Sequence, residues 1–299
     1  MNIIEFKDIR RAFEPGRDVL KGVSFGVTGG EVVGLLGRNG AGKTTLIRIA
    51  MGMLEAQAGS VRLFGLDPRE EPVEVKQRVG YVSEDQVIPP FLRVKEVVGL
   101  HRKLFTNWDD EMARSLAERF RLPLGKKISQ MSKGQARQVA LLCAVSHKPE
   151  LLLLDEPGGG LDPAARREFL ETSIQVLNET GSTILFSSHH LNDVERMADR
   201  VVLIHEGELL LDSDMDRMHE GYSIALVPYE ANGDGAVRRM LSRHERCIAV
   251  RERSDALHAV FSLDPGGAQA LLGNELGIDS AHCRNAALEE MFIELVEGQ

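Results

Sequence analysis

The alternation of apolar and polar residues along this 299-residue chain predicts two kinds of strand. Residues 3–9 and 23–28 alternate as half-buried strands do. Continuous apolar runs at 151–154, 183–186 and 201–204 are instead typical of strands that are covered on both faces. Because helical segments separate these runs, we expect an α/β fold whose core sheet is mostly parallel, together with an N-terminal antiparallel part. Glu206-Gly207 lies between the strand-like segments 201–205 and 208–211 and predicts a closing hairpin.

The period of the pattern changes twice, and the changes predict where the domains lie. From about residue 85 to 130, apolar residues recur three or four positions apart, which is the spacing of amphipathic helices. After about residue 220, short strand-like and helical segments alternate. We therefore predict a large domain over residues 1–220, with a helical subdomain inserted at about 85–145, and a small C-terminal α+β domain over 221–299.

The C-terminal domain ends in an apolar helix at about 286–296, which needs a surface to cover. We favour packing of this helix against the sheet of its own domain. The other interpretation is that the helix supports contacts between two copies of the chain or a regulatory role. No motif in the C-terminal domain indicates chemistry of its own.

The most specific pattern lies between an apolar strand and an apolar helix, and it has the spacing Gly-x4-Gly-Lys-Thr. It comprises Gly37, Arg38, Asn39, Gly40, Ala41, Gly42, Lys43, Thr44 and Thr45. Glycines let successive backbone N–H groups turn toward an anion, and the start of the following helix adds the positive end of its dipole. Lys43 can reach the β- and γ-phosphates of a nucleotide, and the Thr44 hydroxyl can bind Mg²⁺. The loop therefore predicts a nucleoside triphosphate site.

Two further groups of polar residues follow buried strands. Asp155 and Glu156 end the run 151–154, where an acidic residue can hold Mg²⁺ directly or through water, and the next carboxylate can polarise an attacking water. His189 and His190 follow the run 183–186. We expect one of the two histidines to contact the γ-phosphate and interpret the other as an ordinary loop residue.

Ser132 and Gln135 have the spacing of a helix capping box, ahead of a helix that is predicted to run through Val145. Capping alone would explain these residues. A capped helix start is also a place where an anion can bind, so the two interpretations are compatible.

Charge and composition narrow the function classes. The net charge of −9 argues against a broad nucleic-acid-binding face, so we expect no nucleic-acid partner. The three cysteines, Cys143, Cys247 and Cys283, have no metal-site or disulfide spacing, and we interpret them as thiols in a reducing compartment. No apolar run approaches the roughly 20 residues of a membrane span. We therefore expect a protein that is soluble by itself, for which another chain would supply any membrane span.

Together these residues resemble the nucleotide-binding subunit of an ABC transporter over residues 1 to about 215. Five motifs occur in the order of that family: residues 37–45 resemble Walker A, 131–135 the signature Leu-Ser-Gly-Gly-Gln, 151–156 Walker B, Leu161-Asp162 the D-loop, and His189 the switch histidine. Phe13 lies where the family places an aromatic residue that stacks on adenine.

The resemblance implies an ATPase that uses Mg²⁺ and works as a head-to-tail dimer, either of two copies or with a closely related subunit. Each ATP would lie between the Walker A loop of one chain and Ser132, Gly134 and Gln135 of the other. Lys43, Glu156 and His189 would be catalytic, with Glu156 orienting water and His189 contacting the γ-phosphate.

The resemblance also implies a membrane partner. An integral membrane permease, encoded separately, would hold the chain on the cytoplasmic face of the membrane, with its coupling helix in a groove near Glu84. The residues around Glu84 and the ending at 287–295 resemble a bacterial branch that often exports drugs, peptides or lipids.

Three departures from the family pattern bear on the rate of ATP turnover and not on whether turnover occurs. Glu84 replaces the usual glutamine beside Mg²⁺, and a carboxylate there adds negative charge near the metal. Lys133 replaces a signature glycine, and the segment 158–160 before the D-loop consists of three glycines. Because Lys43 and Glu156 are present, we expect hydrolysis to survive these changes.

Two other functions compete with transport. One is a soluble regulator of the ABC type, acting in translation, cluster assembly or DNA repair. A single ATPase unit without long coiled coils argues against it. The other is a module that binds ATP without turnover, against which the presence of Glu156 and His189 argues.

Overall fold

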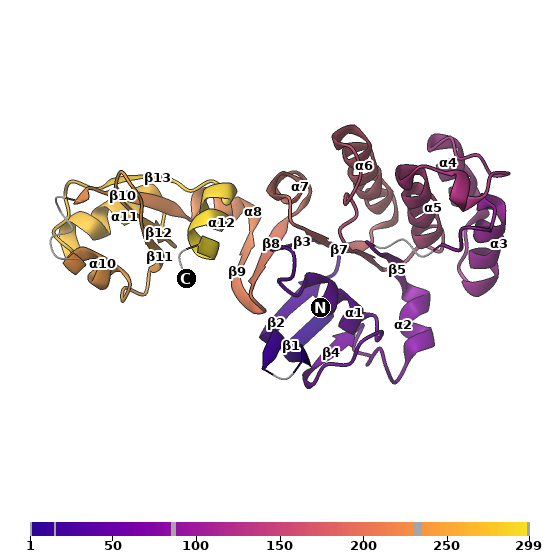
Figure 1. Ribbon diagram of the computed structural model, residues 1–299, viewed down its shortest axis with the longest axis horizontal. Coiled ribbons are helices and arrows are strands. Elements are labelled where there is room, and N and C mark those ends of the chain that lie inside the picture. Colours follow the sequence, from indigo (N-terminus) through magenta and orange to yellow (C-terminus); the bar gives the residue numbers. More distant parts are fainter. Residues whose placement is uncertain (1, 15, 85–87, 230–234, 298–299) are drawn as a thin grey trace. The chain divides into compact units, whose positions relative to one another are not determined.

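The computed structural model describes residues 2–14, 16–84, 88–229 and 235–297. The chain divides into two compact units, Met1–Asp212 and Ser213–Gln299 (Figure 1). The division lies eight residues before the predicted boundary at 220/221. Residues 85–87, with which the predicted helical subdomain begins, lie outside the described residues. No helix among the residues that the structure describes has the length and apolar character that a bilayer span requires.

A six-stranded sheet forms the centre of the first unit, in the order β5-β6-β7-β3-β8-β9. Its strands are β3 (Val32–Leu36), β5 (Val79–Val82), β6 (Leu151–Leu154), β7 (Thr183–Ser188), β8 (Arg200–His205) and β9 (Glu208–Asp214). The five strands from β5 to β8 pair in parallel, as the continuous apolar runs predicted. All four leucines of β6 are fully buried, which confirms a sheet that is covered on both faces.

β8 and β9 form the predicted hairpin at Glu206-Gly207. These two strands are neighbours in the sheet, and a connection of two residues is short enough only for antiparallel strands. Glu206 and Gly207 have φ values of 46° and 82°. Two residues with positive φ are what the tight turn of a two-residue hairpin requires.

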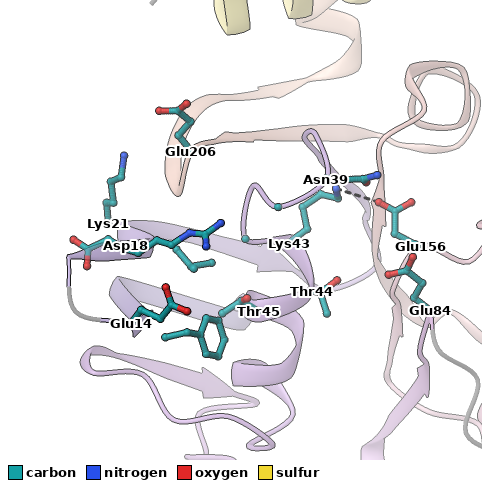
Figure 2. A pocket seen from close by; sticks show the side chains of 15 residues that line it. Glu14, Asp18, Lys21, Asn39, Lys43, Thr44, Thr45, Glu84, Glu156 and Glu206 are labelled. Carbon is teal, nitrogen blue, oxygen red and sulfur yellow. Dashed lines mark ion pairs between the residues drawn. The ribbon is translucent and has the colours of Figure 1, made fainter.

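A second, antiparallel sheet has the order β2-β1-β4, and it confirms the strands predicted near the N-terminus. It consists of β1 (Asn2–Glu14), β2 (Arg17–Thr28) and β4 (Ala58–Leu63). The rings of Phe6 and Phe25 lie 4.7 Å apart in the core that this sheet shares with α1 (Lys43–Ala50) and the central sheet. The packing places the end of β1 beside the loop that precedes α1 (Figure 2).

The helices of the first unit surround the central sheet (Figure 1). Its helices are α1, α2 (Pro72–Arg78), α3 (Val94–Leu104), α4 (Asp110–Arg119), α5 (Lys133–Val145), α6 (Pro163–Thr180) and α7 (Leu191–Met197), with a short 3₁₀ turn at Ile128–Gln130. α5 contacts both α3 and α4 and packs on β5, and these three helices lie within the segment 85–145 for which a helical subdomain is predicted. On α4, Leu116 and the following Phe120 are buried, as their spacing predicted.

The second unit is a four-stranded antiparallel sheet in the order β11-β12-β10-β13. Its elements are α8 (Met215–Glu220), β10 (Ser223–Val227), α10 (Ala236–Leu241), β11 (Cys247–Glu252), β12 (Leu257–Phe261), α11 (Pro265–Ala270), the π-helical turn η3 (Leu271–Glu275), β13 (His282–Asn285) and α12 (Leu288–Glu297). α12 contacts β11 and β12 and buries Leu288, Met291 and Leu295. Packing of the last helix on its own sheet is therefore confirmed.

Candidate nucleotide-binding and catalytic site

The site lies at one edge of the central sheet. β3, β6 and β7 are parallel neighbours, so the segments that follow them meet at their carboxyl ends. A cavity of about 860 Å³ opens there (Figure 2). It is lined by Phe13, Glu14, Arg17, Asp18, Val19, Lys21, Asn39, Gly40, Gly42, Lys43, Thr44, Thr45, Glu84, Glu156 and Glu206. The cavity thus brings most of the predicted loop residues together with Phe13, Glu84 and Glu156.

The loop before α1 has the shape of an anion cradle. Gly40 and Gly42 have φ values of 85° and 107°, in the region that favours glycine. A Cβ atom on Gly42 would lie 2.6 Å from a methyl carbon of Leu20, so a larger residue does not fit there. Gly42 directly precedes the first turn of α1, whose free N–H groups face the cavity side of the loop.

The ammonium group of Lys43 is held between the loop and a carboxylate. Its Nζ donates hydrogen bonds to the carbonyl oxygens of Gly37 at 2.8 Å and Arg38 at 3.2 Å. It also lies 3.1 Å from Oε1 of Glu156, an ion pair that lacks the alignment of a hydrogen bond. Both side chains are more than nine-tenths buried, so water screens this pair little. A phosphate in the loop therefore meets a fixed positive charge.

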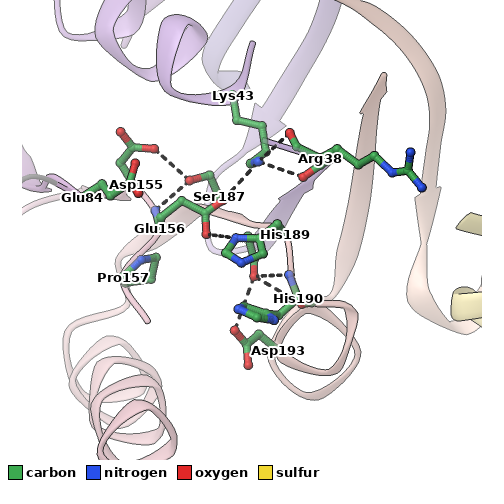
Figure 3. A network of polar contacts seen from close by, with 12 residues as sticks. Arg38, Lys43, Glu84, Asp155, Glu156, Pro157, Ser187, His189, His190 and Asp193 are labelled. Carbon is green, nitrogen blue, oxygen red and sulfur yellow. Dashed lines mark hydrogen bonds and ion pairs between the residues drawn. The ribbon is translucent and has the colours of Figure 1, made fainter. Parts of the chain in front are cut away.

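Asp155 and Thr44 form the part of the site that fits a magnesium ion. Oδ1 of Asp155 accepts a hydrogen bond from the Thr44 hydroxyl at 2.9 Å. It also accepts one from the Ser187 hydroxyl at 2.9 Å (Figure 3). Oδ2 is buried and has no hydrogen-bond partner among the described residues. Burial raises the pKa of the Asp155 carboxyl, while the two hydroxyls oppose the rise. A divalent cation would supply the missing partner, and carboxylate and hydroxyl oxygens are its preferred ligands.

Glu84 lies in the same cavity as Thr44, with an exposed side chain (Figure 2). Its carbonyl oxygen is fixed by a hydrogen bond from Arg137. The predicted position of Glu84 beside the magnesium residues is thus compatible with the cavity, and its role as a metal ligand stays a prediction.

Glu156 is held from several sides in a conformation that residues other than glycine rarely adopt, with a φ of 46°. Its backbone N–H donates to Oγ of Ser187 at 2.8 Å, and its carbonyl accepts from Arg137 at 3.0 Å. Oε2 of its side chain lies 2.8 Å from Nδ1 of His189 (Figure 3). Strain of this kind persists only where the surroundings fix it, and it is concentrated at functional sites.

The geometry distinguishes the two histidines that the sequence left open. His189 contacts the carboxylate of Glu156 and is about one-third exposed. His190 lies behind it, with the two ring centres 3.9 Å apart, and its backbone bonds to Ser188. Burial, and then the charge of Arg166, lower the pKa of His190. His189 is therefore the histidine that can reach a phosphate beside Glu156.

The remaining predicted residues lie at three places. Phe13 is exposed at the end of β1, with the Arg11 guanidinium 5.1 Å from its ring, and its free face can stack on a purine. Arg38 contributes its carbonyl to Lys43, and the side chain of Ala41 is buried in the core. Neither Arg38 nor Ala41 is among the described residues that line the cavity.

The predicted capping box is confirmed. Oγ of Ser132 accepts from the Gln135 N–H at 3.1 Å, and Oε1 of Gln135 accepts from the Ser132 N–H at 3.2 Å. Ser132, Gly134 and Gln135 do not appear among the described residues that line the cavity of their own chain. The start of α5 thus contributes none of the described residues that line the cavity of its own chain.

Two residues of the site were not predicted from the sequence. Ser187 joins Asp155 to the backbone of Glu156, and it lies directly after a buried apolar run. Arg137 is buried and binds carbonyl groups next to Glu156. One feature of the sequence could have predicted a role for Arg137. It lies one helical turn before Leu141, on the buried face of α5, and a charged residue that is buried needs partners.

Comparisons with known proteins identify relatives that bind ATP. A family model described as "ABC transporter" matches residues 20–159. The ABC transporter ATP-binding protein YtrB of Bacillus subtilis (strain 168) is 31% identical over 236 residues, which cover 79% of this chain and 80% of YtrB. The bacitracin transport ATP-binding protein BcrA of Bacillus licheniformis is 28% identical over 309 residues, which cover 99% of this chain and 98% of BcrA. A solved structure of the ATP binding subunit of an ABC transporter superposes with a TM-score of 0.65 at 31% identity, covering 73% of this chain and 92% of that one.

Proposed function

Because the chain belongs to the family of ABC transporter ATP-binding proteins, which hydrolyse ATP, we propose that it powers a separate membrane permease and that the transport is export. The observation that carries the proposal is that Lys43 and Glu156 form an ion pair in the cavity of the phosphate loop, with His189 in contact with the same carboxylate. The likeness to BcrA over almost the whole chain supports a cargo-transporting role. The residues around Glu84 and the C-terminal ending support the exporting branch.

In the proposed reaction, the triphosphate lies in the glycine loop, and Phe13 stacks on the base. Lys43 binds the terminal phosphates as a fixed positive charge. Glu156 orients the attacking water and accepts its proton, and general-base help of this kind contributes about 10²–10⁴-fold in rate. His189 holds one oxygen of the Glu156 carboxylate, so that the other faces the γ-phosphate beside Lys43. Mg²⁺, held by Thr44 and Asp155 and near Glu84, would neutralise charge on the phosphates.

We propose that two chains, or this chain and a close relative, complete each site head to tail. The capped start of α5 carries Ser132, Gly134 and Gln135, and each of these residues is partly or fully exposed, so a phosphate held by another chain can approach them. A helix start offers N–H groups and the positive end of its dipole to an anion. This arrangement gives the signature residues a role that they do not have within one chain.

The permease would dock on the helical part and hold the chain on the cytoplasmic face of the membrane. A second cavity of about 410 Å³ lies between β5, α3 and α5. Its lining is mainly apolar and includes Ile88, Leu92, Leu100 and Leu104. An apolar groove of this size suits a short helical segment of a partner.

The test is capture of the permease by tagged Glu156→Gln protein, with ATP and Mg²⁺, from detergent-solubilised membranes of the native cells. Co-purification of a protein with several membrane spans is expected. Leu100→Asp in the groove should abolish it, whereas Leu124→Asp should not, since Leu124 is equally exposed, at 46% against 47%, but lies outside that groove. A soluble dimer that captures no membrane protein would contradict the transport role and favour a soluble regulator.

A further inference from the structure

The guanidinium of Arg137 joins three segments of the site. Arg137 lies on α5 and is only 6% exposed. Its Nη1 donates to the carbonyl oxygens of Glu156 at 3.0 Å and Pro157 at 2.5 Å, and its Nη2 donates to the carbonyl oxygen of Glu84 at 3.0 Å. We propose that Arg137 is a positioning residue for hydrolysis, which fixes the turn at Glu156 and the segment at Glu84 to the helix that begins at Ser132. The inference rests on the proposed function of that site.

Only arginine suits this set of acceptors. The guanidinium carries five N–H donors in a rigid plane and stays charged, so it can bind three carbonyl oxygens from different directions. A lysine ammonium is a compact point charge on a flexible stem and cannot hold all three in one geometry. The three carbonyl groups also compensate for the cost of burying the charge, which would be large without partners.

The turn at Glu156 needs support from outside its own backbone. A left-handed conformation is strained for a residue other than glycine, so the chain relaxes unless it is held. Ser187 fixes the N–H of Glu156, and Arg137 fixes its carbonyl. With both sides of the residue fixed, the carboxylate projects toward Lys43 and His189. A small shift of Arg137 would therefore change the direction of the catalytic carboxylate.

Gly159 makes room for this arrangement. A Cβ atom at position 159 would lie 3.2 Å from the carbonyl oxygen of Glu156 and 3.6 Å from Nη2 of Arg137. The first distance is tighter than ordinary contact, so a side chain would press on the very carbonyl that Arg137 binds. The departure at Gly159 is thus accounted for by the close approach of the Glu156 carbonyl oxygen that Arg137 binds.

Through its hydrogen bonds, Arg137 connects the start of α5 with the turn at Glu156 and the segment at Glu84. Arg137 is five residues after Ser132, or about 7.5 Å along the helix axis. Its other partners are the catalytic turn and the segment at Glu84, on the side where the permease is proposed to dock. Through Arg137, displacement of α5 by the second chain or by the permease reorients Glu156.

The test compares Arg137→Ala and Arg137→Lys with Arg119→Ala, a charge-matched control whose guanidinium is exposed and bonds to Gln175 on α6. We expect kcat to fall about 10- to 100-fold in both Arg137 variants while KM and ATP affinity stay near those of the wild type, because misplacing a reacting group costs rate rather than binding. Added guanidinium ion at millimolar concentration should restore part of the kcat of Arg137→Ala and leave Arg119→Ala unchanged.

An unchanged kcat in both Arg137 variants, or a loss of ATP affinity with kcat preserved, would overturn the inference. If Arg137→Ala does not fold, Arg137→Lys decides, because it keeps the charge and the length of the side chain. ATP turnover by the wild type shows whether a negative result counts against the proposed function or against the role of Arg137 alone. A wild-type chain without turnover overturns the proposed function and this inference together, whereas an active wild type with unaffected Arg137 variants overturns this inference alone.

Discussion

Nδ1 of His189 lies 2.8 Å from Oε2 of Glu156, while the other oxygen of that carboxylate lies 3.1 Å from Nζ of Lys43. Each oxygen of Glu156 therefore faces a different positively charged or hydrogen-bonding group. The carboxylate and Lys43 are nearly buried, and His189 closes the site from the more exposed side. The pair fixes the plane of the carboxylate, which determines where an attacking water can be bound.

Replacing His189 by alanine should lower kcat by about 100-fold, because the carboxylate of Glu156 loses the contact that orients it. ATP affinity should change little, since Lys43 and the glycine loop remain. Phosphate release and nucleotide binding, measured on the same preparations, check both statements. His190→Ala is the control, and equal losses of kcat in the two variants would contradict the role given to His189.

Ser187→Ala should lower both stability and turnover. The Ser187 hydroxyl accepts from the Glu156 N–H and donates to Asp155, so its removal leaves a buried N–H group without its partner. A loss of about 1–3 kcal/mol in the free energy of unfolding follows. Urea unfolding of Ser187→Ala and of Ser173→Ala measures it. Among the residues that the structure describes, the Ser173 hydroxyl bonds to the Phe169 carbonyl of its own helix alone, so a comparable loss there would refute the specific role of Ser187.

The stability of the first unit should fall in mild acid because of His147. Its ring is buried against Phe105, its Nε2 lies 3.2 Å from the Val79 carbonyl, and burial lowers its pKa from 6.5 to about 4. The fold favours neutral imidazole, so this stabilisation is complete above the unfolded pKa of 6.5 and is lost as the pH falls through about 4. The difference corresponds to about 3 kcal/mol.

Urea unfolding of the wild type and of His147→Gln between pH 7 and pH 4 measures this term. The variant should show a shallower decline than the wild type, because its side chain does not bind a proton in this range. Parallel declines would show that His147 is not the group responsible.

Asp155→Asn should separate stability from metal binding. Burial raises the pKa of Asp155 above its ordinary value of 3.8, so the fold favours the protonated form. Stability therefore falls as the pH rises from 3.8 toward the folded pKa, and the full cost of the ionised form is present above the folded pKa. Near pH 7 in EDTA the variant should therefore melt at or above the wild-type temperature, whereas the stabilisation by Mg²⁺ and ATP should be lost. Thermal unfolding under both conditions checks this, and full stabilisation by Mg²⁺ and ATP would refute Asp155 as a magnesium ligand.

In the second unit, stability should depend on a buried carboxylate. Glu294 is 4% exposed, and its Oε1 accepts from Nε and Nη2 of Arg253 at 3.1 and 2.9 Å. Breaking a buried pair costs about 3–5 kcal/mol, and partial exposure of Arg253 reduces the expected loss for Arg253→Met to about 2 kcal/mol. Adding Glu294→Gln should recover part of it. Additive losses in a double-mutant cycle would show that the two residues do not interact.

The sequence predicted those parts of the molecule that depend on local spacing. The phosphate loop, the capping box of Ser132 and Gln135, and the turn at Glu206-Gly207 each use neighbouring residues, so their patterns are legible in one segment. The bond between Thr44 and Asp155 spans 111 positions, and that between Arg137 and Glu84 spans 53. Such contacts depend on how strands are ordered in the sheet, which residue spacing does not specify.

For similar reasons, the sequence did not predict the strand β13 of the second unit and did not distinguish His189 from His190. β13 is short and mostly exposed, so its residues lack the apolar run that identifies a strand. The preference for His189 over His190 depends on the position of Glu156, which comes from a neighbouring strand.

The central claim is that the turn at Glu156 is the centre of ATP hydrolysis, and release of phosphate by the purified chain tests it most directly. Wild-type protein and Glu156→Gln should be compared at saturating ATP and Mg²⁺, with nucleotide binding and dimer formation measured in parallel. The account predicts turnover by the wild type and at least about a 100-fold loss in the variant, with ATP binding and ATP-dependent dimers retained. Equal turnover by the two proteins would contradict it.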